Sequence, residues 1–353
     1  MDAPPTSVLL PTVRWTEACE EVANQLGADD ELLVICDTAT DPVATRRSES
    51  GSGIEEDVAS GSGAEVDCGS LPDGVRIVLA GEPEDCSGKA NAIATGMEVA
   101  TRDRIVWTDD DFRHPPDWLA TLHADYDRQG STTEVPVFVG RDPLARLFEP
   151  AYAIGGTVSV AVGGIVWGGA VVFERVDLRD PTDCDGASDR AAASDRDGDA
   201  TRNREAVESL CQDLRRTVSD DGTLTEYLDV TAADRTRTVP SGGSIRGSLE
   251  RFVRFFQIVR HHAPRSAALN VVLSVGLAGL CLFAPVIGVA LVTILSVAVY
   301  ARFGIRRATF LLAGPSVLVS PVFIAYAVAR RTFVWGGRRY RWRSLFDVEV
   351  SAV

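Results

Sequence analysis

Residues 105–119 read IVWTDDDFRHPPDWL: an apolar run, three adjacent aspartates, a proline pair and a tryptophan. The apolar run predicts a buried strand over Arg104–Thr108. Three neighbouring carboxylates at its end repel one another, so each is costly to keep ionised. Asp109 and Asp111, with the chain turning between them, suit a divalent cation and a ligand hydroxyl. A solvated turn that caps the following helix is the alternative.

Outward from this strand, the first 240 residues alternate apolar strands with helical stretches. This alternation predicts an α/β domain with a largely parallel sheet. The expected strands are Ser7–Pro11, Leu32–Cys36, Val75–Ala80, Arg104–Thr108, Val135–Gly140 and Gly169–Phe173, and the expected helices lie near 15–26, 88–101, 116–129 and 143–153.

Two stretches interrupt the alternation, residues 41–72 and 180–205. Both are rich in Ser, Gly, Ala and acidic residues and poor in large apolar ones. Such segments cannot bury enough apolar surface to offset their ordering entropy. We expect disordered or solvated insertions that carry no chemistry.

Charge is divided unevenly along the chain. The formal net charge is −15, but residues 241–353 carry +11 and residues 1–240 carry −26. The acidic part argues against nucleic-acid binding, because phosphates would be repelled. With 34 Arg against one Lys, the composition is typical of a salt-adapted organism. The seven cysteines include no CxxC pair, so neither a disulfide framework nor a zinc site is predicted.

Membrane segments are predicted near the C-terminus. Residues 266–301 contain no charge over 36 positions, and residues 308–329 none over 22. Both exceed the roughly 20 residues that a spanning helix needs, and Pro285 is the natural break in the first. No signal peptide is expected, since MDAPPTSVLLPT lacks a basic start and a long apolar run.

Arginines flank these segments on every side, so the positive-inside rule predicts a multi-pass protein of the cell membrane with a cytoplasmic N-terminal domain. The expected organisation is a catalytic-type domain over 1–240, an amphipathic interfacial helix over 241–265, membrane segments over 266–331 and a basic cytoplasmic tail over 332–353.

In open α/β sheets the ligand lies beyond the carboxyl ends of the strands. Asp37 follows the strand Leu32–Cys36, and the three aspartates follow Arg104–Thr108. We expect these carboxylates to lie at one edge of the sheet and to form the site there.

The order of motifs along the chain resembles the family 2 glycosyltransferases with the GT-A fold, and within them the membrane-bound group similar to ceramide glucosyltransferase. SVLLPT resembles the first strand, SGKANAIATG the lysine-containing stretch before the donor site, and VWTDDDFRHPPDWL the DxD segment. WGGAVVFER, Trp167 to Arg175, resembles the acceptor-side strand after a Gly-Gly turn.

The resemblance implies roles for individual residues. Asp37, Lys89, Asp109 and Asp110 are expected to bind the nucleotide-sugar donor, and Asp111 with Asp109 to hold the metal. Gly88 and Asn91 complete the lysine stretch, and Trp167, Gly168 and Gly169 are expected on the acceptor side. Lys89 is the only lysine, which indicates a position where a compact ammonium suits and a guanidinium does not.

Two matches are looser. VSDDGTLTEYL offers Asp220, Asp221 and Leu224 for the family's ED-then-leucine element, which makes Asp221 the catalytic base; an acidic turn (DDG) is the alternative. In an extended or turn conformation neighbouring side chains point apart, so only one of the two aspartates is expected to face the acceptor.

The second looser match reads QIVRH, where Gln257 and Arg260 occupy donor-side positions and His261 replaces the family's tryptophan. An amphipathic membrane anchor is the alternative there. WGGRRYRW, Trp335 to Trp342, resembles the family's tail, or a basic-aromatic belt beside the membrane.

The resemblance as a whole implies a membrane-bound inverting glycosyltransferase. It would use Mg²⁺ or Mn²⁺ and move a sugar from a nucleotide sugar to a lipid acceptor. The family resemblance favours a UDP-sugar as the donor. No nucleic acid is expected as a partner. Two alternatives stay open: a polyprenyl-phosphate or dolichyl-phosphate glycosyltransferase of a protein glycosylation pathway, and an inactive membrane interaction protein with the GT-A fold.

Overall fold

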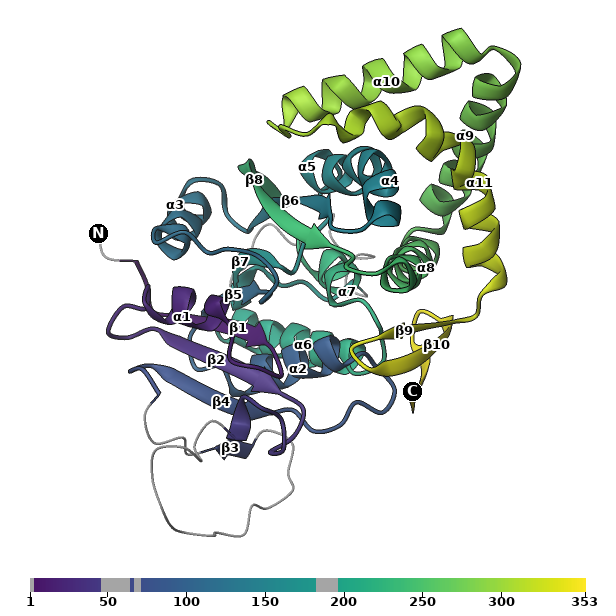
Figure 1. Ribbon diagram of the computed structural model, residues 1–353. Coiled ribbons are helices and arrows are strands. Elements are labelled where there is room, and N and C mark those ends of the chain that lie inside the picture. The colour runs from purple at the N-terminus through teal and green to yellow at the C-terminus, as the bar shows by residue number, and fades with distance from the viewer. Residues whose placement is uncertain (1–2, 46–63, 67–70, 182–195) are drawn as a thin grey trace. The chain divides into compact units, whose positions relative to one another are not determined.

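The computed structural model describes residues 3–45, 64–66, 71–181 and 196–353 (Figure 1). The chain forms two compact units. The first contains Met1–Thr133 and Val166–Thr231, and the second contains Glu134–Ile165 and Ala232–Val353. The chain therefore leaves the first unit, returns to it and leaves again. The predicted boundary at residue 240 stays a prediction.

A mixed sheet forms the centre of the first unit. Its strands are β1 (Thr6–Pro11), β2 (Glu31–Cys36), β3 (Ala64–Val66), β4 (Val75–Leu79), β5 (Arg104–Thr108) and β7 (Ala170–Glu174), in the spatial order β3-β4-β2-β1-β5-β7. The first residues of β6 (Thr132–Gly140) extend it, because Thr132 and Thr133 pair with Val172 and Val171.

The expectation of a largely parallel sheet is right for the centre and wrong for the edges. β1 pairs in parallel with β2 and β5, and β2 with β4. β3 with β4, β5 with β7 and β6 with β7 are antiparallel. A parallel neighbour needs a crossover along the face of the sheet. Before β7, however, the chain runs through residues 134–165, which belong to the second unit.

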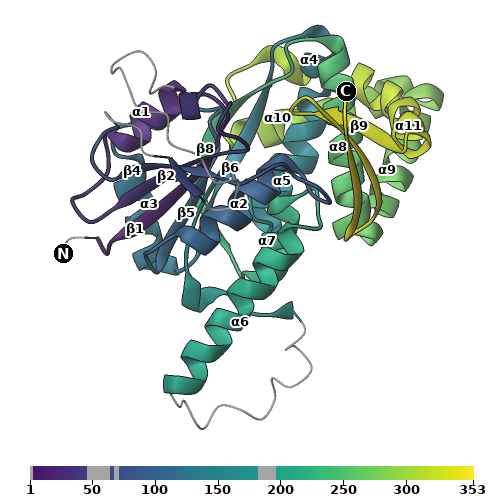
Figure 2. The same cartoon turned by 90° about the horizontal axis from the view of Figure 1, so that it is seen from below.

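Helices flank this sheet: α1 (Glu17–Ala23), α2 (Gly88–Val99), α3 (Trp118–Gln129), α6 (Arg196–Leu214) and α7 (Asp220–Tyr227). One apolar core joins α2 and α6 to the strands, with Ile35, Ile93, Trp107 and Leu210 almost fully buried. Gly96 permits this packing, because a Cβ there would lie 2.5 Å from the Ile35 side chain. Figure 2 shows α6 projecting from the first unit, with α7 at its C-terminal end.

The two predicted insertions are corrected in part. Ala64–Val66 forms strand β3, and α6 begins at Arg196 rather than after residue 205. The later half of α6 packs on α2, and this tertiary contact outweighs the polar composition at the helix start. Residues 46–63, 67–70 and 182–195 lie outside the described part of the chain.

The second unit holds the remainder of β6 beside β8 (Thr231–Ser241), then α4 (Pro143–Tyr152), a π-helical turn η2 (Ala153–Thr157) and α5 (Val158–Gly163). These are followed by α8 (Ile245–His262), α9 (Pro264–Phe283), α10 (Pro285–Arg302), the 3₁₀ turn η5 (Ala308–Leu312) and α11 (Ala313–Ala329).

Three helical segments of this unit are long and apolar enough to cross a membrane: Pro264–Phe283, Pro285–Arg302 and Ala308–Ala329. The predicted break at Pro285 is confirmed, since only Ala284 separates α9 from α10. Much of their surface is apolar and exposed, for example Val272 at 67% and Val286 at 83%. Such a surface is typical of helices that face lipid.

The predicted basic tail is a three-stranded antiparallel sheet, formed by β9 (Thr332–Trp335), β10 (Arg338–Ser344) and β11 (Asp347–Ala352). Alternation along β10 buries Tyr340 and Trp342 and exposes Arg339, Arg341 and Arg343. The His261 ring of α8 stacks on Trp342 at 4.5 Å between ring centroids. Burial, together with the charge of Arg260, lowers the pKa of His261 to about 4, so this ring is neutral at pH 7.

Candidate active site

Helix α2 positions Lys89 within its first turn. Ser87 caps the helix, accepting a hydrogen bond from the backbone N–H of Ala90. The Asn91 side chain donates to the carbonyl oxygens of Ala80 at 3.2 Å and Gly81 at 2.9 Å, which ties the helix start to the end of β4. The SGKAN stretch thereby holds the lysine at the carboxyl ends of the strands.

The three aspartates after β5 have different surroundings. The backbone N–H of Asp109 donates to the carbonyl of Gly169 at 3.2 Å, which joins this turn to the Gly-Gly turn before β7. Asp110 accepts a hydrogen bond from the Thr12 hydroxyl at 2.5 Å, and burial raises the pKa of its carboxyl. Asp111 is exposed.

Asp220 and Asp221 begin helix α7 and do not form the acidic turn that was the alternative. Ser219 is the N-cap and accepts from the backbone N–H of Gly222 at 3.1 Å. Carboxylates in a first helical turn are stabilised by the helix dipole. The side chain of Asp220 is 6% exposed and that of Asp221 is 37% exposed.

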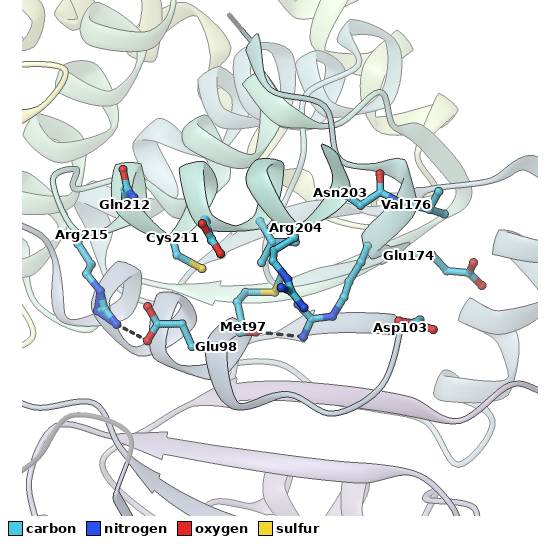
Figure 3. A pocket seen from close by; sticks show the side chains of 13 residues that line it. Met97, Glu98, Asp103, Glu174, Val176, Asn203, Arg204, Cys211, Gln212 and Arg215 are labelled. Atoms are coloured by element: carbon cyan, nitrogen blue, oxygen red, sulfur yellow. Dashed lines mark hydrogen bonds and ion pairs between the residues drawn. The ribbon is translucent and has the colours of Figure 1, made fainter. Parts of the chain in front are cut away.

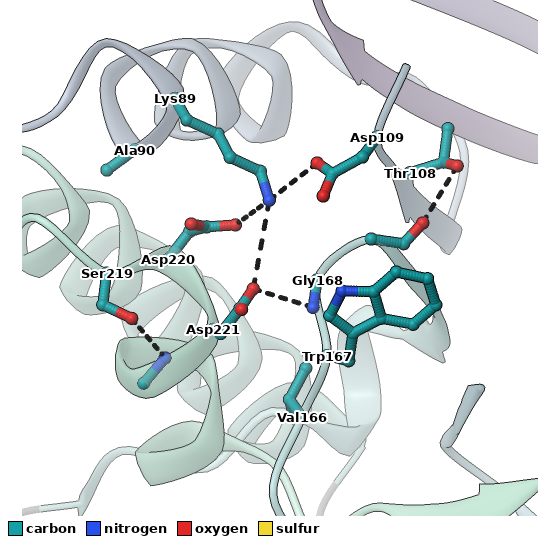
Figure 4. Close-up of polar contacts among 12 residues, drawn as sticks. Lys89, Ala90, Thr108, Asp109, Val166, Trp167, Gly168, Ser219, Asp220 and Asp221 are labelled. Atoms are coloured by element: carbon teal, nitrogen blue, oxygen red, sulfur yellow. Dashed lines mark hydrogen bonds and ion pairs between the residues drawn. The ribbon is translucent and has the colours of Figure 1, made fainter. Parts of the chain in front are cut away.

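These elements bring three carboxylates together around one ammonium (Figure 4). Lys89 Nζ lies 2.7 Å from Asp109 Oδ1, 2.9 Å from Asp220 Oδ2 and 4.0 Å from Asp221 Oδ1. Burial alone would lower the pKa of Lys89, but the three carboxylates outweigh it and hold that pKa well above its usual value. Lys89 is therefore a permanent cation that bridges the end of β5 and the start of α7.

Which of the two aspartates faces the acceptor stays a prediction, but their side chains do not point apart as they would in an extended or turn conformation. Because both lie in the first turn of α7, both carboxylates are directed toward Lys89. They differ in access instead: Asp220 is buried against the lysine, whereas Asp221 is the more exposed of the two.

Gly168 lies against these carboxylates. Its backbone N–H donates to Asp221 Oδ1 at 2.8 Å. A Cβ at this position would lie 2.5 Å from Asp221 Oδ1 and 2.8 Å from Asp220 Oδ2, closer than atoms can approach. Glycine is needed here because the backbone itself contacts the carboxylates.

Asp221 has the titration behaviour of a base. Burial and the neighbouring negative charge of Asp220 raise the pKa of Asp221 to about 7, although Lys89 acts in the opposite direction. A carboxylate with a pKa near the working pH is suited to accept a proton from a bound hydroxyl.

Trp167 and Gly169 shape the remaining part of this turn. A Cβ on Gly169 would lie 2.4 Å from the Trp167 ring, so the indole packs directly on the glycine backbone. That ring also lies 5.3 Å from the ring of Phe112, just after the three aspartates. The expected acceptor-side residues are thus next to the carboxylate cluster.

The other predicted site residues are placed as follows. Asp37 is buried at the end of β2, where its carbonyl accepts from the backbone N–H of Gly81 at 2.9 Å. Gln257 and Arg260 belong to the second unit. Gln257 is buried and donates to the carbonyls of Ala327 and Arg330, while Arg260 is exposed. Their donor-side roles stay predictions.

The residues after β5 fit a hard divalent cation. Among the described residues no three His, Cys, Asp or Glu side chains gather to hold a metal by themselves. Mg²⁺, however, is usually bound by one or two carboxylates together with substrate phosphates. Asp111, exposed in the turn after β5, would supply such an oxygen ligand.

A cavity of about 780 Å³ in the first unit lies elsewhere, between α2 and α6 (Figure 3). Its charged groups are mainly engaged: Arg215 pairs with Glu98 at 2.6 Å, and Arg175 donates to the Met97 carbonyl at 3.0 Å. None of the predicted site residues lines this cavity, so it is not the candidate active site.

Sequence reasoning missed the groups that hold the site together. Thr12, Ser219 and the Thr225 hydroxyl, which accepts from the backbone N–H of Val166 at 3.1 Å, were not singled out. Only Ser219 has a recognisable signal, a serine directly before two acidic residues at a helix start.

Comparison with known proteins gives a family match for part of the chain. Residues 72–182 match the family model described as glycosyl transferase family 2. This segment includes Lys89, the three aspartates and Trp167–Gly169, while Asp37 and the Asp220–Asp221 pair lie outside it. A comparison with curated proteins found no match.

Several solved structures are similar at low identity. Glucosyl-3-phosphoglycerate synthase from Mycobacterium tuberculosis, in complex with phosphoglyceric acid, is 14% identical, with 72% of this chain and 80% of that chain covered and a TM-score of 0.34. Mannosyl-3-phosphoglycerate synthase from Rubrobacter xylanophilus is 12% identical, with 74% of each chain covered and a TM-score of 0.37. A complex of the mycobacterial enzyme with Mn²⁺, UDP-glucose and phosphoglyceric acid is 17% identical, with a TM-score of 0.30. That match covers 50% of this chain and 59% of the mycobacterial chain.

The family match covers residues 72–182, less than half of the chain, and this segment is similar to glycosyl transferase family 2. The narrower resemblance to the ceramide glucosyltransferase-like group stays a prediction.

Proposed function

We propose that this chain is a membrane-bound inverting glycosyltransferase that moves a sugar from a nucleotide sugar to the hydroxyl of a lipid. One observation carries the proposal: Lys89 joins Asp109 and the Asp220–Asp221 pair in a single cluster at the strand ends, partly within the segment that matches the family. Donor-side and acceptor-side groups are thereby adjacent.

The donor would bind at the ends of β2 and β5. Asp37 would hold the nucleoside, and Asp109 and Asp110 the nucleotide sugar. Mg²⁺ or Mn²⁺ on Asp111, with Asp109, would neutralise the diphosphate charge that this acidic unit otherwise repels. Lys89 contributes a fixed positive charge beside the same diphosphate.

On the acceptor side, Asp221 is the base. Its carboxylate accepts the proton of the acceptor hydroxyl, whose oxygen forms a bond to the anomeric carbon while the bond from that carbon to the diphosphate oxygen breaks. The electron pair leaves with the nucleoside diphosphate. A single displacement of this kind inverts the anomeric configuration. Gly168 keeps the carboxylate oriented through its N–H.

The acceptor is proposed to be a lipid because of the second unit. Three of its helices are long and apolar enough to span a membrane, and arginines flank them at residues 260, 265, 302, 306, 307, 330 and 331. By the positive-inside rule the helix ends that carry these arginines face the cytoplasm, where nucleotide sugars are available.

The test is a screen of labelled nucleotide sugars with the reconstituted full chain and total lipid extract, read as label in the organic phase. We expect one donor to give lipid-bound label with the wild type and none with Asp221→Asn. Release of free sugar alone would count against lipid transfer, and no turnover with any donor would favour the inactive interaction protein.

A polyprenyl phosphate is the second candidate acceptor, and the exposed arginines beside the membrane segments favour it, among them Arg260, Arg265 and Arg331. A phosphate oxygen is already ionised and needs no base. Asp221→Asn would then keep most of the transfer activity, which distinguishes the two acceptors.

A further inference from the structure

Residues 150–173 form an uncharged stretch that the membrane prediction does not include. No charged residue occurs over these 24 positions, between Glu149 and Glu174. The last part is strand β7 of the first unit, but residues up to Ile165 belong to the second unit. The part in the second unit, residues 150–165, contains the C-terminal end of α4, the turn η2, and α5.

The same segment packs on the apolar helices of its unit. Phe148 of α4 lies 4.8 Å from Phe323 of α11, ring centroid to ring centroid. The turn η2 lies against α10. Glu149 is 2% exposed and accepts from Arg307 and Thr309, so the α10–α11 connection is tied to α4.

An apolar rim is left uncovered. Val162 is 79% exposed and Ile165 is 36% exposed. Gly163 and Gly164 lie between them, also exposed, and no charged side chain interrupts the rim. In water such a rim is unfavourable, whereas beside lipid-facing helices it continues their apolar surface.

We infer that residues 150–165 are a fourth membrane-contacting element, which lies in the bilayer interface with Val162 and Ile165 against lipid. The inference rests on the proposed membrane location of α9 to α11. The segment is too short for a crossing, since its uncharged helical part is residues 150–163, which is 14 residues against the roughly 20 that a crossing needs.

This element is joined to the catalytic base by three residues of chain. After Ile165, the backbone N–H of Val166 donates to Thr225 at 3.1 Å, and that of Gly168 donates to Asp221 at 2.8 Å. The chain that contacts lipid therefore continues directly into the turn that orients the base.

Photo-crosslinking to lipid tests the inference. The full chain carries p-benzoylphenylalanine in place of Val162, in vesicles of phosphatidylcholine and phosphatidylglycerol, and lipid adducts are counted by mass spectrometry. Val272 of α9, 67% exposed, is the positive control, and Val176 of the first unit, 58% exposed, is the matched negative control. All three positions are exposed valines, so the photoreactive ring does not enter the core.

We expect lipid adducts at 162 and 272, each at least tenfold above 176. Adducts at 272 with none above background at 162 would overturn the inference and leave the membrane location intact. Absence of adducts at 272 would refute the membrane location of α9, a part of the proposed function, and the inference with it.

Discussion

Lys89 shows at the residue scale why this position is not arginine. Its ammonium lies within 4.0 Å of three carboxylates that come from β5 and α7. A compact charge on a flexible stem can approach all three, whereas a planar guanidinium pairs best with one carboxylate in two-point fashion. The single lysine among 34 arginines is thus explained by the geometry of its partners.

Asp221 and Asp220 should differ sharply when each is neutralised. Asp221→Asn removes the base and should lower turnover with a hydroxyl acceptor by about 10²–10⁴, the usual contribution of general base catalysis. Asp220→Asn should do much less, because the Asp220 side chain is buried against Lys89 and only 6% exposed. Steady-state kinetics with donor binding measured in parallel checks this.

Donor affinity should stay near the wild-type value in both variants, which is the control for folding. If the two phenotypes were exchanged, Asp220 would be the base. If neither variant slowed transfer to a hydroxyl, the base would lie elsewhere.

The pH dependence follows from the raised pKa of Asp221, about 7. The base acts only when ionised, so kcat/KM should rise with pH up to about 7 and then level off; below that pH it should fall about tenfold per unit. Asp220→Asn removes a neighbouring negative charge, which should move the inflection to lower pH. A wild-type inflection near 4, the ordinary carboxyl value, would contradict this assignment.

At the scale of elements, the turn Val166–Gly169 packs directly against the start of α7. Gly168→Ala would place a Cβ 2.5 Å from Asp221 Oδ1, so the turn or the carboxylate must shift. A displacement of about 1 Å at a catalytic group can cost on the order of 10² in rate. We expect that loss in kcat with little change in donor binding.

Gly163→Ala is the matched control, because its Cβ would meet Ile165 at an ordinary 3.6 Å. It should retain wild-type kcat. Equal activity of Gly168→Ala and Gly163→Ala would show that the base does not depend on this turn.

The elements differ in how far sequence could predict them. Arg104–Thr108 was expected with the bounds that the structure shows, because a short apolar run ended by three aspartates is a strong signal. Helix α7 was missed: Gly222 suggested a turn, but Ser219 caps a helix there. The tail was expected to resemble the family's tail or to be a basic-aromatic belt, and its alternation of Arg with Tyr340 and Trp342 forms a strand.

For the site, sequence could predict the residue types and their order but not their contacts. Lys89 and Asp220 are 131 positions apart along the chain, and only the folded sheet brings their side chains within 2.9 Å. The hydrogen bond from Gly168 involves a backbone group, which carries no mark in the sequence beyond the glycine itself.

At the scale of the whole chain, the contacts within the second unit limit the number of membrane crossings. Gln257, just before α9, donates to the carbonyls of Ala327 and Arg330 at the end of α11, and Glu250 accepts from the backbone N–H of Val334. In the proposed membrane location, both ends of the apolar block 264–329 therefore lie on one side of the bilayer. Three crossings would place them about 30 Å apart, so the number is even.

We accordingly predict two crossings, with the third apolar segment lying along or re-entering the membrane. Tags placed after Val353 and before residue 3 should be digested by protease from the same face of sealed vesicles. Protection of one tag and digestion of the other would mean an odd number of crossings.

The most direct test of the central claim is transfer of labelled sugar from a nucleotide sugar into lipid by the reconstituted full chain, with added Mn²⁺. The wild type should transfer label, and excess EDTA should abolish the transfer. Asp111→Asn should also abolish it while the fold survives, because Asp111 lies on an exposed turn. Full transfer by Asp111→Asn, or transfer that is unchanged in excess EDTA, would contradict metal-assisted donor binding at this site.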